Sequence, residues 1–121
     1  MCRASPAFRS IAGTNNGIGS QGIVIDGTEE QKKKYLPRVA RKEISAFALT
    51  EWNAGSDPAN MSCRAEPTED GSEFILNGEK LWCTNGTKAG VIVVMARTPA
   101  KEGRNQITAF IDASMVYGSD E

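Results

Sequence analysis

Trp82 and Thr84 place an indole and a hydroxyl two positions apart, a combination that could bind a ligand. We expect them on a strand over 79–84, where side chains two positions apart point to the same side. A planar heteroaromatic ligand could then stack on the indole while the hydroxyl bonds to a ring nitrogen or oxygen. The alternative is that Trp82 is a core or interface anchor, as strand tryptophans usually are. The spacing alone leaves both interpretations open.

Thr50 and Ser56 are further candidates for polar contacts to a ligand. Thr50 ends an expected strand over 44–51, on the same face as two alanines. Small residues beside a hydroxyl leave room for a flat group, or they mark tight packing against a helix. Ser56 lies in a turn-rich segment, whose amides and hydroxyl could hold a polar group. Asp57 could equally satisfy the N–H groups of that turn itself.

The composition excludes several kinds of catalytic site. The chain has no histidine, so a Ser-His-Asp triad, a Cys-His pair and an HExxH zinc site are all excluded. Its three cysteines, Cys2, Cys63 and Cys83, are odd in number and show no CxxC spacing. We therefore expect no disulfide framework, and we assign no metal ligand and no catalytic residue.

A glycine pattern over 17–22 matches the dinucleotide fingerprint G-x-G-x-x-G. That fingerprint requires a strand before the glycines and a helix that opens at them. The preceding residues are not strand-like, so we interpret these glycines as small residues where helices pack closely.

A family resemblance rests on three segments, which read Phe47-Ala48-Leu49-Thr50-Glu51, Ala54-Gly55-Ser56-Asp57 and Leu81-Trp82-Cys83-Thr84-Asn85-Gly86. In this order they resemble the flavin-binding middle domain of acyl-CoA dehydrogenases. The resemblance extends upstream through 27–37 and downstream through 107–111. It implies FAD as the cofactor, with Thr50 bonding near the pyrimidine end of the flavin, Trp82 covering the face away from the substrate, and Thr84 bonding at N5. The cofactor-binding residues that it implies are Phe47, Leu49, Thr50, Ser56, Trp82, Cys83 and Thr84, of which Ser56 would also touch acyl-CoA.

The resemblance also implies a function for the full enzyme. Members remove an α-proton from an acyl-CoA and pass a hydride from the β-carbon to flavin, which gives a trans-enoyl-CoA. Their base is a glutamate on a C-terminal helical domain that this sequence does not contain. We therefore expect a truncated middle segment, inactive alone, and leave open whether the chain is an enzyme. The alternatives are a fragment of an acyl-CoA oxidase or a non-catalytic β-domain that binds a partner or ligand.

Two positions depart from the family pattern. Trp52 stands where proline is usual, and Cys83 stands where isoleucine is common. The first change replaces a rigid turn former with a bulky aromatic, which affects where Ser56 lies.

The hydrophobic periodicity along the chain predicts an α+β fold. We expect a helical N-terminal segment over 1–42, the end of an N-terminal helical domain, and then a small antiparallel β-barrel or sandwich over 43–121. Thr28 and Gln31 have capping-box spacing before one helix, which Pro37 should bend or break. Further strands are expected over 73–77, 91–97 and 106–112, and Asn77-Gly78 predicts a two-residue hairpin.

Charge and composition limit the partners. The formal net charge is −1, which favours neither nucleic acid nor an anionic membrane surface. No apolar run approaches the ~20 residues of a transmembrane segment. From the cysteine pattern we expect a cytoplasmic protein, and we expect a homo-oligomer. The resemblance implies acyl-CoA as the substrate of the full enzyme and an electron-transfer flavoprotein as a partner.

Overall fold

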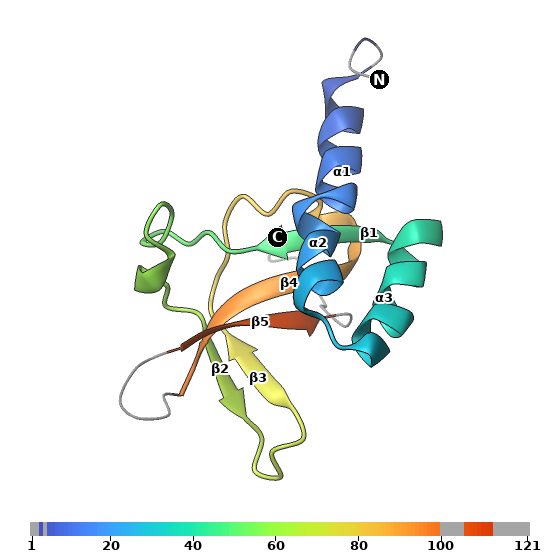
Figure 1. Cartoon of the computed structure of the whole chain (residues 1–121). Helices are drawn as coiled ribbons and strands as arrows, with labels where there is room; N and C mark the ends of the chain where they lie inside the picture. The colour runs from blue at the N-terminus through green and yellow to red at the C-terminus, as the bar shows by residue number, and fades with distance from the viewer. Residues whose placement is uncertain (1–2, 4, 100–105, 113–121) are drawn as a thin grey trace. The chain divides into compact units, whose positions relative to one another are not determined.

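The computed structural model describes residues 3, 5–99 and 106–112. Within these described residues, three helices are followed by a sheet of five strands, which confirms the expected α+β class (Figure 1). In chain order the elements are α1 (Pro6–Asn16), α2 (Ile18–Asp26), α3 (Glu29–Arg41), β1 (Ile44–Ala48), β2 (Arg64–Pro67), β3 (Phe74–Asn77), β4 (Ala89–Thr98) and β5 (Gln106–Asp112), with single 3₁₀ turns at Pro58–Asn60 and Gly86–Lys88.

The sheet is mixed and open. Its order is β1-β4-β2-β3, with β5 also paired to β4. β2 pairs with β3 antiparallel but with β4 in parallel, where Arg64 lies opposite Arg97. The expectation of an antiparallel barrel or sandwich was therefore wrong. The physical reason is that the residues after β3 do not return as a strand, so β4 reaches β2 only after a long connection, as parallel pairing requires.

The chain divides into two compact units, which we describe separately. The helical unit comprises Met1–Phe47, Thr84–Val93 and Ile111–Glu121, and the hairpin unit comprises Ala48–Cys83 and Val94–Phe110. The core of the helical unit is formed by four buried residues from α2, α3 and β4, which are Ile23, Val39, Val91 and Val93. The core of the hairpin unit is formed by Cys63, Ala65 and Ala96, with Leu76 and Phe110 packed against them.

The helices follow the local signals in the sequence. The Thr28 side chain accepts from the backbone N–H of Gln31, and the Gln31 side chain accepts from that of Thr28, so the predicted capping box is confirmed. α3 continues through Pro37, so the expected break does not occur. In α2, a side chain at Gly19 would place its Cβ 2.5 Å from Ser45 Oγ. Gly19 thus lies where α2 closely approaches Thr14 of α1 and Ser45 of β1, so the packing interpretation holds for this glycine, whereas Gly22 has only an ordinary contact with Val93 at 3.8 Å.

The hairpin lies one connection earlier than expected. β2 and β3 are joined by a turn in which the Thr68 N–H donates to the Glu73 carbonyl at 3.0 Å. Asp70 organises the turn by accepting from Thr68 Oγ1 at 2.6 Å. The hairpin predicted at Asn77-Gly78 was wrong. Gly78, with φ of +147°, instead lets the backbone pass close to Cys63, whose Cα would lie 2.7 Å from a Cβ at this position.

Candidate functional site

The motif segment Phe47–Glu51, which continues past the end of β1, is hydrogen-bonded to the residues just before Trp82. The Leu81 N–H donates to the Thr50 carbonyl at 2.8 Å. Lys80 Nζ donates to the Leu49 carbonyl at 3.1 Å and to Glu51 Oε1 at 2.7 Å. Two stretches that are about thirty positions apart in the sequence therefore lie side by side within the hairpin unit.

Glu51 is a buried carboxylate whose oxygens are fully engaged. It is 6% exposed and forms an ion pair with Lys80. Its Oε2 accepts from Ser62 N at 2.5 Å and Ser62 Oγ at 2.7 Å, and its Oε1 also accepts from Cys63 N at 3.0 Å. Burial alone would raise the pKa of Glu51, but the bonds from Lys80, Ser62 and Cys63 more than offset it and lower the pKa to about 2. Glu51 is therefore ionised throughout the neutral range.

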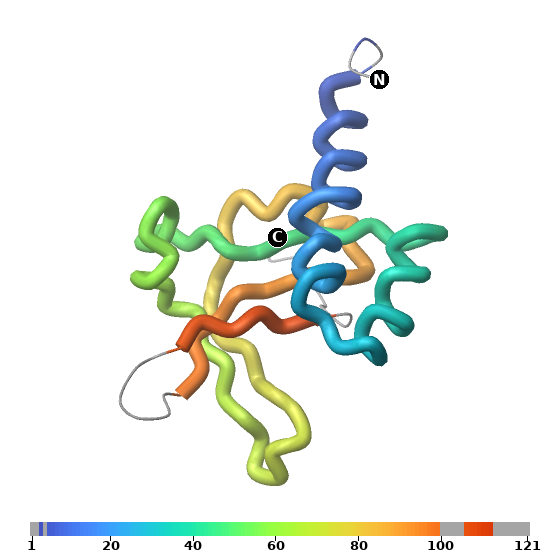
Figure 2. The backbone as a smooth tube through the Cα atoms, in the orientation of Figure 1, coloured from blue at the N-terminus to red at the C-terminus, as the bar shows by residue number. Residues whose placement is uncertain are grey.

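Trp82 lies in an irregular stretch and not in a strand. No strand is assigned between β3 and β4, and Figure 2 shows this stretch as an irregular path. The strand expected over 79–84 was therefore wrong, and so was the argument that alternation places Trp82 and Thr84 on one face. The backbone of Trp82 has φ of +56°, and its side chain is 86% exposed. Positive φ is a genuine outlier for a bulky residue, so this conformation calls for a reason.

Thr84 is exposed and belongs to the helical unit. Together with residues of α1 and the start of α2, it lines a pocket of about 600 Å³. The next residue, Asn85, has φ of +69° and donates to the Ser45 carbonyl at 3.1 Å and the Ile11 carbonyl at 3.3 Å. These bonds fasten the turn that carries Thr84 to α1 and β1. The volume lies within the ~300–1,000 Å³ of typical small-molecule pockets.

The remaining predicted residues differ in accessibility. Phe47 is half-buried and packs against the core of the helical unit. Leu49 and Cys83 are half-buried in the hairpin unit. Ser56 is exposed in the turn-rich loop, and the Asp57 side chain accepts from Ala59 N at 3.2 Å. Asp57 therefore satisfies an N–H group of its own turn, which is the simpler of the two interpretations of this turn-rich segment.

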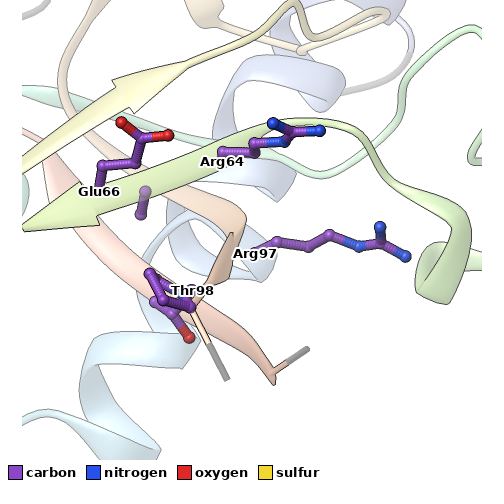
Figure 3. A pocket seen from close by; sticks show the side chains of 6 residues that line it. Arg64, Glu66, Arg97 and Thr98 are labelled. Atoms are coloured by element: carbon purple, nitrogen blue, oxygen red, sulfur yellow. The ribbon is translucent and has the colours of Figure 1, made fainter. Parts of the chain in front are cut away.

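A second pocket in the hairpin unit carries no predicted site residue. It has a volume of about 220 Å³, and Figure 3 shows the side chains of Arg64, Glu66, Arg97 and Thr98 around it. The Arg97 guanidinium is already held, because its Nη2 donates to the Ala59 carbonyl at 2.6 Å. We assign this pocket no role.

The ion pair between Lys80 and Glu51 lies beside the motifs, and sequence reasoning did not predict it. The available signal was the presence of one acidic and one basic residue at the ends of otherwise apolar or hydroxyl-bearing segments. Only the folded chain shows that they meet.

Neither a metal-binding cluster nor a membrane-spanning helix is present in the part of the chain that the structure describes. In residues 3, 5–99 and 106–112, no three His, Cys, Asp or Glu side chains are grouped so that they could hold a metal ion. None of the helices in these ranges is both long and apolar enough to cross a bilayer.

Helices followed by an open mixed sheet, with two motif segments hydrogen-bonded beside an exposed tryptophan, define an α+β protein. Family models show to which family this α+β protein belongs. The model of the acyl-CoA dehydrogenase middle domain matches residues 46–116, and that of the N-terminal domain matches residues 1–43. The chain belongs to the acyl-CoA dehydrogenase family.

Individual proteins and solved structures are also similar to this chain. A probable acyl-CoA dehydrogenase, FadE10 of Mycobacterium tuberculosis, is 55% identical over 104 residues, which are 84% of this chain and 16% of that protein. An acyl-CoA dehydrogenase from Bacillus anthracis, solved in complex with FAD, has a TM-score of 0.79 and 42% identity over 87% of this chain and 18% of its own. A structure described as the electron transferring flavoprotein of Acidaminococcus fermentans has a TM-score of 0.80 and 34% identity over 89% of this chain and 28% of its own. The chain thus spans less than a third of the length of each of these proteins.

Proposed function

We propose that this chain forms the flavin-contacting part of an acyl-CoA dehydrogenase, in which Thr50, Trp82 and Thr84 hold the isoalloxazine ring of FAD. The observation that carries the proposal is the conformation of Trp82, which has φ of +56° and a side chain that is 86% exposed. Strained backbone conformations cost about 1–3 kcal/mol and cluster where ligands bind. An indole held out in this way offers a free face on which an aromatic ring can stack.

The residues around Trp82 fit the polar edge of a flavin. Thr50 is half-buried, and its carbonyl is occupied by the Leu81 N–H, while its hydroxyl has no hydrogen-bond partner within the described ranges. That hydroxyl is available to the pyrimidine end of the ring, where Leu49 would offer a backbone N–H. For Thr84 the support is the sequence motif, together with the pocket that it lines in its own unit. Phe47, Cys83 and Ser56 complete the proposed set, with Ser56 also touching acyl-CoA.

In the complete enzyme, FAD would accept the hydride from the β-carbon of an acyl-CoA. The residues of this chain would orient the ring and stabilise the charge of its reduced form through hydrogen bonds at N5 and the pyrimidine edge. They would not remove the α-proton. Glu51, the buried carboxylate of the described residues, is committed to Lys80 and has a pKa of about 2, so it is a poor proton acceptor. Acyl-CoA and an electron-transferring flavoprotein are the proposed substrate and partner of the whole enzyme.

A titration of FAD with the 121-residue chain tests the proposal. Stacking contributes about 0.5–1.5 kcal/mol beyond burial, and each neutral hydrogen bond about 0.5–1.5 kcal/mol. After the cost of association, the expected dissociation constant is on the order of high micromolar to millimolar. Flavin fluorescence should be quenched on binding, because the indole lies against the ring.

The chain offers a matched control for this titration. Trp52 is 77% exposed in the same unit, so Trp52→Ala removes an equally accessible indole. We expect Trp82→Ala to abolish quenching and Thr84→Val to weaken binding, while Trp52→Ala leaves both unchanged. Equal effects of the two tryptophan substitutions would refute the proposed site.

A further inference from the structure

We infer that Glu51 and Lys80 are positioning residues, which hold the Trp82 segment against the Leu49–Thr50 segment so that both can meet one ligand. The inference rests on the proposed flavin site and names residues that do not touch the flavin themselves. It begins from the contacts between the two segments. Lys80 Nζ bridges Glu51 Oε1 at 2.7 Å and the Leu49 carbonyl at 3.1 Å, and the adjacent Leu81 N–H bonds to the Thr50 carbonyl at 2.8 Å.

No strand ladder fixes the Trp82 segment in place. Within the described part of the chain, the residues from 79 to 83 belong to no strand or helix. Packing around the Trp82 ring contributes little, since the side chain is 86% exposed. The segment must therefore be held through its neighbours, and Lys80, two positions before Trp82, has a side chain that is only 11% exposed.

The carboxylate to which Lys80 is bound is itself fixed. Ser62 supplies two hydrogen bonds to Oε2 and Cys63 supplies one to Oε1, just before the start of β2. The backbone of Glu51 also exchanges two hydrogen bonds with Ala54, at 2.9 and 3.3 Å. Because Glu51 has these other partners, its carboxylate is held also without Lys80, whereas the Lys80 ammonium is held by Glu51 and the Leu49 carbonyl.

This arrangement assigns distinct tasks to neighbouring residues. Glu51 and Lys80 set the separation between the two segments, while the hydroxyl of Thr50 and the indole of Trp82 remain free for a ligand. A charged pair suits this task, because a buried ion pair with satisfied hydrogen bonds has a strong geometric preference. Apolar side chains of similar size would fill the space without fixing the register of the segments.

The first test reads the position of the segment without any ligand. The double variant Glu51→Gln/Lys80→Met removes both charges, so neither is left buried and unpaired. Its matched control is Glu43→Gln/Arg38→Met, which removes the ion pair of 2.8 Å in the helical unit. Hydrogen exchange at the Leu81 amide should accelerate at least tenfold relative to the Ala65 amide in the first double variant, and not in the control. Unchanged protection of Leu81 in a folded double variant would overturn the inference.

The second test reads the consequence for the ligand, with FAD as the probe. Glu51→Gln and Lys80→Met should each weaken FAD binding about tenfold, and the double variant should lose no more than the single variants, because the pair acts as one unit. Additive losses would show that the two residues act separately, against the inference. If the parent chain shows no FAD binding at all, the proposed flavin site fails and with it the role toward a flavin, while the exchange test still decides whether the pair positions the segment.

Discussion

Replacing Glu51 with glutamine should remove much of the acid sensitivity of this fold. The folded pKa of Glu51 is about 2 against a reference value of 4.5. A carboxyl whose folded pKa is depressed stabilises the protein above its unfolded pKa, and this stabilisation is lost as the pH falls through the folded value. A difference of about 2.5 pKa units corresponds to about 3 kcal/mol at neutral pH. For a side chain that is 4% exposed, solvent screening reduces this figure little.

The size of this term makes it measurable. A small domain has a total stability of about 5–15 kcal/mol, so about 3 kcal/mol is a substantial share. With these pKa values, about 2 kcal/mol of it should disappear between pH 5 and pH 3. Urea unfolding followed by circular dichroism at pH 7, 5, 4 and 3 would give the free energy of unfolding at each pH.

Glu51→Gln should be less stable than the parent at pH 7, because an amide offers one acceptor oxygen where the carboxylate has two. The difference between the two proteins should then shrink by about 2 kcal/mol between pH 5 and pH 3. Asp70→Asn is the matched comparison, since Asp70 also has a pKa lowered to about 2, through bonds from Thr68 and Ser72, but lies in an exposed turn. Because solvent screens an exposed group, the difference between Asp70→Asn and the parent should change less between pH 5 and pH 3 than the difference for Glu51→Gln. If parent and Glu51→Gln lose stability in parallel over this range, the assigned pKa of Glu51 is wrong.

Two further predictions concern the elements that support the site. Thr28→Ala should cost about 1 kcal/mol of stability by removing the capping box of α3, measured by urea unfolding, whereas an unchanged midpoint would show that the cap is dispensable. Gly78→Ala should lower the melting temperature far more than Gly55→Ala. A Cβ at Gly78 would lie 2.7 Å from Cys63 Cα, whereas one at Gly55 meets nothing within 4 Å. Equal shifts in melting temperature would contradict the close approach at Gly78.

Local signals in the sequence were sufficient to predict the helices and the most apolar strands. The capping box of α3 involves residues three positions apart, and β4 has four consecutive buried residues, from Val91 to Val94. Both depend on interactions between near neighbours or on burial of a continuous apolar run. β2 could not be predicted in this way, because its sequence of Arg64-Ala65-Glu66-Pro67 contains one buried apolar residue and ends in proline.

The turn around Gly78 shows why one strong local signal was misleading. Asn-Gly is favoured in two-residue hairpins because both positions tolerate positive φ. Gly78 does adopt positive φ, at +147°, but the backbone needs it to pass Cys63 and not to reverse direction. The reversal falls at Thr68–Glu73, where Asp70 and Gly71 provide the side-chain bonds and the left-handed position. The sequence thus specified the conformation of a residue without specifying what that conformation is for.

The same distinction applies to Trp82. Family resemblance identified its motif, whereas strand periodicity predicted the wrong backbone, because the contacts that hold the segment join residues about thirty positions apart. A bulky residue with φ of +56° and an exposed ring would be unfavourable in isolation. The residues just before it are held by Glu51 and by the backbone of Leu49 and Thr50. The charged pair that sequence reasoning overlooked thus joins the segment of this exposed indole to the segment that carries Thr50.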